Sequence, residues 1–246
     1  MTTVAVPVSW QADLTASARR LSAVVAVGLA AGAAIGGVGG RLAMLVLRLT
    51  SSDSLHGLES DDGFVMGQVS GSTLFLIMLT GALGVVGALF YFAVRGWIPA
   101  GSRAAWTGVF GAAVGGAGVV HPDGIDFNML EPLWLAVAFF VALPAAYGVT
   151  MSVLVERALR RDAQGRPAGG RAWIVGLIPL IALAIAGTTG LVVLVLLAGA
   201  WWLRRSLPQV AALWRSTALV WAGRVALLAF TVWSGWLLVR DATQIL

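Results

Sequence analysis

The chain has 246 residues, 59% of them hydrophobic, and a mean hydropathy of +0.90. This much apolar surface is more than a soluble globule can cover with polar residues, so the composition predicts a protein whose solvent is lipid. The formal net charge of +5 does not indicate a nucleic-acid-binding protein, because the arginines fall in short clusters between apolar runs instead of along one polar face.

Two missing residue types narrow the chemistry. The sequence contains no lysine, which excludes a Schiff base or a lysine nucleophile, and no cysteine, which excludes disulfides, thiolate metal sites and thiol catalysis. We expect no cofactor, no metal site and no enzymatic activity.

The first hydrophobic run covers residues 21–47 and follows Arg19 and Arg20. It predicts a transmembrane helix, since about 20 apolar residues are needed to cross a bilayer. A cleaved signal peptide is the alternative, because two arginines precede an apolar segment with small residues. The run continues far beyond such a cleavage point, which favours the transmembrane helix.

Three further runs are bounded by charges or by Pro and Gly, and each predicts a span: 69–94, 104–120 and 132–155. The next run, residues 172–203, would form a straight helix of roughly 48 Å, longer than the bilayer. Turn-forming residues at 187–190 favour two short helices, 172–187 and 189–203.

The last predicted span is 217–239, which makes seven helices, or six if 172–203 is one helix. The predicted fold is therefore an all-α polytopic transmembrane bundle in a single domain, residues 1–246. With seven helices nearly all loop arginines fall on one side, which should be cytoplasmic. We expect a multi-pass protein of the plasma membrane with a cytoplasmic N-terminus.

Helix one carries a repeat of small residues, a glycine zipper made of Gly28, Gly32, Gly36 and Gly40. Glycines four residues apart share one helix face and let another backbone approach closely, which is how helices associate in lipid. Packing within the chain is the favoured interpretation. An interface with a second copy or another membrane protein is the alternative, and a pore lining is the least favoured.

Charges near membrane depth are costly and are therefore candidate functional residues. Arg41 and Arg48 share a face at the outer end of helix one, and Arg224 lies inside the last run. We expect each to be a snorkelling or structurally paired arginine, or else to bind an anionic lipid or solute. The predicted partners of Arg41 and Arg48 are Asp126 and Glu131, from the loop before the fourth span. For Arg224 the candidate partners are a carbonyl, a hydroxyl or a lipid phosphate.

Residues 121–132 form a polar loop with acids, an amide and His121. Turn and capping chemistry explains this composition better than a divalent cation site, because the spacing fits no EF-hand.

Two classes of function remain after these exclusions. The favoured one is an integral membrane interaction protein, either an accessory or assembly subunit of a membrane complex or a lipid-binding scaffold. Its partners would be membrane lipids, and another membrane protein or a second copy. The alternative is a small permease or channel for a small or lipidic substrate, since Pro144 and Pro179 could interrupt cavity-lining helices.

Overall fold

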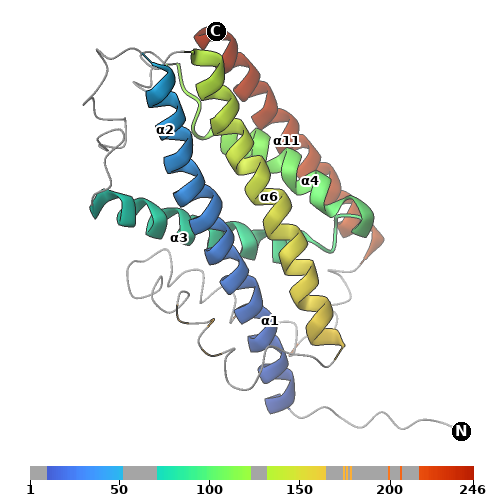
Figure 1. Ribbon diagram of the computed structural model, residues 1–246. Coiled ribbons are helices and arrows are strands. Elements are labelled where there is room, and N and C mark those ends of the chain that lie inside the picture. Colours follow the sequence, from blue (N-terminus) through green and yellow to red (C-terminus); the bar gives the residue numbers. More distant parts are fainter. Residues whose placement is uncertain are drawn as a thin grey trace, which may run out of the picture.

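The computed structural model describes residues 10–51, 71–122, 132–164 and 216–246, and five isolated positions between 174 and 206 (Figure 1). Every regular element in these ranges is a helix. Four helices are long and apolar enough to cross a membrane: Trp10–Thr50, Thr73–Val94, Leu133–Ala163 and Thr217–Ile245. The protein is therefore membrane-embedded and all-helical. The predicted spans 172–187 and 189–203 lie outside the described residues.

The first helix is continuous over 41 residues but changes its winding in the middle. It consists of α1 (Trp10–Ala31), a π-helical stretch η1 (Gly32–Gly39) and α2 (Gly40–Thr50). At 1.5 Å per residue it is about 60 Å long, twice the hydrocarbon thickness, so its ends extend past the apolar layer or the helix is tilted. The predicted bounds 21–47 were too short, because hydropathy marks the lipid boundary and not the end of the helix.

Helix α3 (Gly71–Val94) crosses the first helix and makes its closest contacts there (Figure 1). A Cβ atom at Gly28 would lie 2.6 Å from the carbonyl oxygen of Gly84, and one at Gly36 would lie 2.9 Å from Cβ of Thr80. Gly32 likewise faces the Thr80 carbonyl. A Cβ at Gly40 would meet nothing within 4 Å, so the contact with α3 covers the first three glycines of the repeat and not the fourth.

The predicted span 104–120 is helical but short. It comprises a 3₁₀ turn η3 (Ala100–Ser102), α4 (Arg103–Phe110) and a second π-helical stretch η4 (Gly111–Gly115), and the helix ends by residue 117. Thirteen residues in α4 and η4 extend about 20 Å, less than the hydrocarbon thickness of about 30 Å. The helix described here is thus shorter than the predicted span 104–120, which stays a prediction; the chain continues without regular helix to Val120 at the other end of the bundle.

Helix α6 (Leu133–Ala163) packs along α4 and η4 through small residues. Gly111 lies against the carbonyl oxygen of Pro144, and Gly148 lies against the carbonyl oxygen of Thr107. The Thr107 hydroxyl also donates to the Ser152 hydroxyl at 2.8 Å. The predicted span 132–155 marks the start of α6 correctly, but the helix continues for two more turns of charged residues.

Helix α11 (Thr217–Ile245) begins after Ser216, whose hydroxyl accepts the backbone N–H of Leu219 at 3.3 Å. Near its start it meets the connection between α3 and α4, where Arg224 Nε donates to the Trp97 carbonyl at 2.7 Å. Further along, Phe230 lies 6.1 Å from Phe110 of α4, ring centre to ring centre. Most of its large apolar side chains are exposed, as expected of a helix that faces lipid.

Two clusters of buried apolar residues hold the bundle together. The larger one includes Val24, Tyr91 and Val155, and lies where α1, α3 and α6 meet. The smaller one joins Leu47, Val120 and Ala136 at the opposite end. We call the first region the basic end, because Arg20, Arg95, Arg103 and Arg160 lie there, and the second the far end.

Candidate functional site

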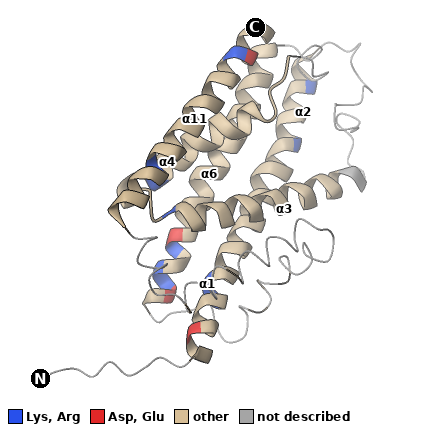
Figure 2. Cartoon of the chain, turned by 180° about the vertical axis from the view of Figure 1, so that it is seen from behind, with Lys and Arg blue, Asp and Glu red and all other residues tan. Residues whose placement is uncertain are grey.

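Figure 2 shows most charged residues near the ends of the long helices: one group lies at the basic end, and others lie on α2 and at the C-terminal end of α11. Four segments contribute to the group at the basic end. They are α1 around Arg20, the residues just after α3, the start of α4 and the end of α6. The sequence places arginines at each of these positions because they are the boundaries of hydrophobic runs. The fold then brings these four boundaries together.

Glu156 of α6 is the centre of the first ion cluster. Its Oε1 accepts hydrogen bonds from Arg95 Nε and from the Tyr91 hydroxyl, both at 2.8 Å. Its Oε2 accepts from Arg95 Nη2 at 3.0 Å and lies 2.9 Å from Arg103 Nη1. Both carboxylate oxygens are thus occupied twice, and the Arg95 contact is the two-pronged geometry that makes guanidinium–carboxylate pairs strong.

Local structure explains this arrangement. Tyr91 and Arg95 are one turn apart at the end of α3, and the Arg95 N–H still donates to the Tyr91 carbonyl at 2.8 Å. Arg103 is the first residue of α4. The Glu156 side chain is only 14% exposed, so it needs these partners to remain a carboxylate near the membrane.

A second ion pair joins α1 to the end of α6. Asp162 lies 3.2 Å from Arg20 Nε and 3.6 Å from Arg19 Nε. The Asp162 side chain is 12% exposed, but the side chains of Arg19 and Arg20 are 35% and 51% exposed. Such a solvated contact is weak, because water and salt screen it.

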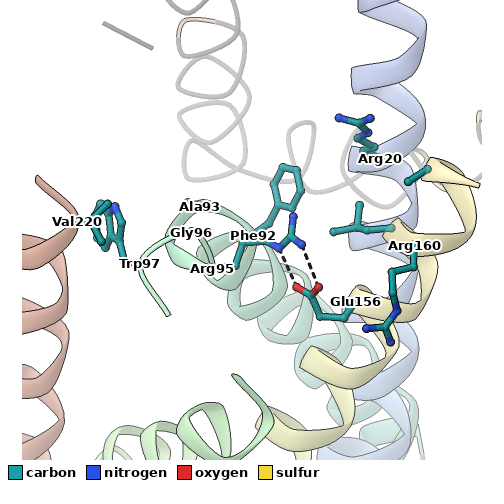
Figure 3. Close-up of a pocket in the computed structure, with 11 residues that line it drawn as sticks. Arg20, Phe92, Ala93, Arg95, Gly96, Trp97, Glu156, Arg160 and Val220 are labelled. Carbon is teal, nitrogen blue, oxygen red and sulfur yellow. Dashed lines mark hydrogen bonds and ion pairs between the residues drawn. The ribbon is translucent and has the colours of Figure 1, made fainter. Parts of the chain in front are cut away.

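A cavity of about 680 Å³ opens between these helices (Figure 3). The lining includes the arginines Arg20, Arg95 and Arg160, and Glu156 is the only acid among the described residues that line it. Trp97 and Val220 lie on the side opposite Arg20 and Arg160 in Figure 3. The remaining wall is apolar and includes Phe92 and Leu159. This is the size and the mixed lining of a pocket for a small organic ligand.

The charge around the pocket is unbalanced. Two acids, Glu156 and Asp162, stand against five arginines, which leaves a formal excess of three positive charges; the arginines are Arg19, Arg20, Arg95, Arg103 and Arg160. Among the described residues, Arg160 has no ion-pair partner. The pocket can therefore attract an anion, and an organic anion would suit it best because of the apolar wall.

Arg224 holds α11 to this pocket. Besides its bond to the Trp97 carbonyl, its guanidinium lies 5.0 Å from the ring centre of Trp221. Gly223 lies against the indole of Trp97, where a side chain would not fit. Of the partners considered for Arg224 from the sequence, the structure provides a carbonyl. Trp97 in turn lines the pocket, so the start of α11 is fixed to the pocket wall.

The other candidate arginines lie elsewhere. Arg41 and Arg48 are half-buried on α2, toward the far end. Asp126 and Glu131, their predicted partners, lie outside the described residues. Of the glycines of the repeat, Gly28, Gly32 and Gly36 shape the contact with α3, Gly40 begins α2 without such a contact, and none of the four lines the pocket.

Sequence reasoning missed Glu156, although a signal was present. Glu156 follows Ser152 by four residues and Gly148 by eight, so all three share the face of α6 that packs against α4. The hydrophobic run ends at Val155, and residues beyond it were treated as a loop. Extending the helical period by one turn would have placed Glu156 inside the bundle.

In comparisons with protein-family models, with curated proteins and with solved structures, the chain matched none.

Proposed function

We propose that the protein is a lipid-binding scaffold of the plasma membrane that holds the headgroup of an anionic phospholipid in the pocket at its basic end. The observation that carries this proposal is the pocket lining, in which the described residues place Arg20, Arg95 and Arg160 against a single acid, next to an apolar wall.

The saturation of Glu156 favours an anionic lipid over a zwitterionic one. A zwitterionic headgroup would need an acid for its ammonium group as well as a cation for its phosphate. Glu156 already accepts from Arg95 and Tyr91 and pairs with Arg103, so it has no free oxygen to offer. The arginines retain unused N–H donors: Arg95 engages Glu156 through only two of its three nitrogens.

The apolar wall favours a lipid over a soluble anion. Phe92, Leu159 and Val220 border the same cavity as the arginines, at the end of helices that cross the membrane. A headgroup at the arginines would place the first carbons of its acyl chains against this wall. A soluble phosphate would leave that wall in contact with water, and burial of apolar surface would contribute nothing to its affinity.

The orientation that follows from this proposal puts the basic end and the N-terminus in the cytoplasm. Arginine-rich ends of membrane helices stay on the cytoplasmic side, and that leaflet carries the anionic lipids. The exposed apolar sides of α11 would face the surrounding lipid or a second membrane protein.

A permease is the second candidate, and one observation favours it. The η4 stretch, a π-helix, packs against Pro144 inside α6, and interrupted helices often line a transport path. Uptake of a labelled lipid analogue into vesicles that depends on the protein would support this alternative.

Lipid analysis of the purified protein tests the proposal. The protein would be extracted in mild detergent, and co-purified lipids would be quantified by mass spectrometry. We expect enrichment of anionic over zwitterionic phospholipid in the native chain and loss of most of it in the double variant Arg20→Gln/Arg160→Gln. Arg161→Gln is the matched control, because Arg161 is exposed on the same turn of α6 but does not line the pocket.

Adding a soluble phosphate ester distinguishes a lipid headgroup from a soluble phosphate as the ligand of the pocket. Glycerol phosphate at millimolar concentration should not displace the lipid if the acyl chains contribute to binding. Equal enrichment in the double variant and the native chain would contradict the proposed function.

A further inference from the structure

The charges of α11 lie close together for a helix that crosses a membrane. Arg224 and Arg240 bound a stretch without any charged residue, 225–239. The two arginines are 16 residues apart, so their Cα atoms are separated by about 24 Å along the helix axis. The hydrocarbon core of a typical bilayer is about 30 Å thick, so the uncharged stretch of α11 is too short by about 6 Å.

Both arginines lie at the levels where other helices reach polar surroundings. Arg224 donates to the carbonyl of Trp97, which follows Arg95 of the basic end by two residues. Leu238, two residues before Arg240, packs against the buried cluster of the far end, to which α2 and the start of α6 contribute. The two arginines therefore mark the polar boundaries on this side of the bundle.

The contacts of the two guanidinium groups leave little length to be gained by snorkelling. The guanidinium of Arg240 lies 5.6 Å from the ring centre of Trp236, one turn back toward the middle of α11. Arg224 lies 5.0 Å from the ring centre of Trp221. Trp221 and Trp236 are 59% and 53% exposed, and exposed indoles prefer the interface between headgroups and hydrocarbon. These two side chains are 15 residues apart, which places the two interfaces about 22 Å from each other.

The neighbouring segment is short as well. Phe110 of α4 lies 6.1 Å from Phe230 of α11, and α4 and η4 together cover about 20 Å. By contrast, α3 is free of charge over its 24 residues and α6 over residues 133–155, which is about 34 to 36 Å of helix. A span that is too long can fit by tilting, but a span that is too short cannot lengthen. We call α4, η4 and α11 the short side of the bundle.

We propose that the short side thins the bilayer next to it and binds phospholipids with short acyl chains. A span that is too short thins the bilayer, snorkels or oligomerises. The contacts of Arg224 and Arg240 oppose snorkelling, and an exposed indole at each end of the stretch favours a face that meets two lipid interfaces. Without thinning, one arginine would enter the hydrocarbon, which is costly. This inference does not depend on headgroup binding at the basic end.

The depths of two spin labels test the thinning. Single cysteines would replace Val225 or Val239, which are both 62% exposed and lie about 21 Å apart, in the full chain in dioleoyl phosphatidylcholine. Accessibility to oxygen and to a water-soluble nickel chelate gives the depth of each nitroxide. The two depths below the polar boundaries should add to about 3 Å in a thinned layer and to about 9 Å in an unthinned one. A sum near the larger value would overturn the inference. Labels shielded from both reagents would also overturn it, because a second protein surface would then cover α11.

Removing the charges at the far end tests the cause. The variant Arg240→Leu/Asp241→Leu removes one charge of each sign and extends the uncharged stretch to residues 225–245, about 32 Å of helix. We expect the highest melting temperature of the native chain in dimyristoleoyl phosphatidylcholine, and that of the variant in dioleoyl phosphatidylcholine. Arg161→Leu is the control, because Arg161 is exposed at the end of α6, outside the short side, and it should keep the native order.

The same order of melting temperatures in the native chain and the double variant would overturn the inference. If the double variant does not fold, the summed label depths decide alone. All these lipids are zwitterionic, so each outcome is independent of the anionic headgroup at the basic end, and a failure here leaves the proposed function intact.

Discussion

The hydroxyl of Tyr147 in α6 donates a hydrogen bond of 2.6 Å to the carbonyl oxygen of Gly84 in α3. Gly84 is also the residue against which Gly28 of α1 packs, so three helices meet at one backbone position. In lipid no water can satisfy a buried phenol, which gives this bond a structural role. It joins the α1–α3 pair to α6.

Removing this hydroxyl should lower stability modestly. In Tyr147→Phe the Gly84 carbonyl keeps its helical donor, so we expect a loss of about 1 kcal/mol in unfolding free energy. Gly84→Ala should cost more, because Gly28 and Gly32 leave no room for a Cβ atom. Thermal unfolding in one detergent would compare the two; a Tyr147→Phe variant less stable than Gly84→Ala would contradict the account.

Substitutions of Gly32 and Gly40 in the repeat of helix one can be compared directly, because only Gly32 contacts α3. Gly32→Ala should destabilise the bundle by about 1 to 3 kcal/mol, since its Cβ would overlap the backbone of α3 at Thr80 and Gly84. Gly40→Ala should be neutral or slightly stabilising, because its Cβ meets nothing within 4 Å and alanine favours the helix. Equal melting temperatures for both variants would show that the contact with α3 is not close-packed.

Glu156 and its partners Tyr91, Arg95 and Arg103 should be energetically coupled in their contributions to the free energy of unfolding. Glu156→Gln removes a carboxylate that is 14% exposed and leaves Arg95 and Arg103 without their acid, and we expect a loss of about 2 kcal/mol. Tyr91→Phe should cost less than half of this, since Arg95 still holds the carboxylate. A double-mutant cycle between Tyr91 and Glu156 measures their coupling, and strictly additive losses would argue against the cluster.

The position of α11 gives a prediction about topology. Arg224 at its start bonds to Trp97 at the basic end, which is also where α6 ends. We therefore expect Gly165 and Ser206 to lie on the same side of the membrane, and Gly124 on the other. Single cysteines introduced at these positions, in a chain with none of its own, would be labelled with an impermeant reagent. Labelling of Ser206→Cys together with Gly124→Cys would contradict this arrangement and favour six helices.

Hydrophobic runs predicted the described spans well, but the pocket only in part. The predicted span 132–155 begins within one residue of α6, because apolar runs are what lipid selects. The helical residues beyond Val155 were missed, since hydropathy does not register a helix that leaves the membrane. The sequence predicted that Arg20 and Arg95 lie on the same side of the membrane, because each stands at the boundary of a hydrophobic run.

The contacts within the site could not be read from the sequence. Glu156 meets Tyr91 and Arg95 across more than 60 residues, and only the packing of α6 against α3 brings them together. The same holds for the bond between Arg224 and Trp97, which depends on where α11 docks. The periodicity of α6 identifies the buried face, but it does not identify the partner helix.

The central claim is that an anionic phospholipid sits with its headgroup at Arg20, Arg95 and Arg160 and its first acyl carbons at the apolar wall. Photo-crosslinking tests this most directly, with an anionic phospholipid that carries a diazirine near the start of one acyl chain. We predict crosslinks at residues 92–97, 159–163 and near Val220, strongly reduced with the zwitterionic analogue and in Arg20→Gln/Arg160→Gln. Crosslinks spread along the exposed face of α11, and equal for both lipids, would contradict the account.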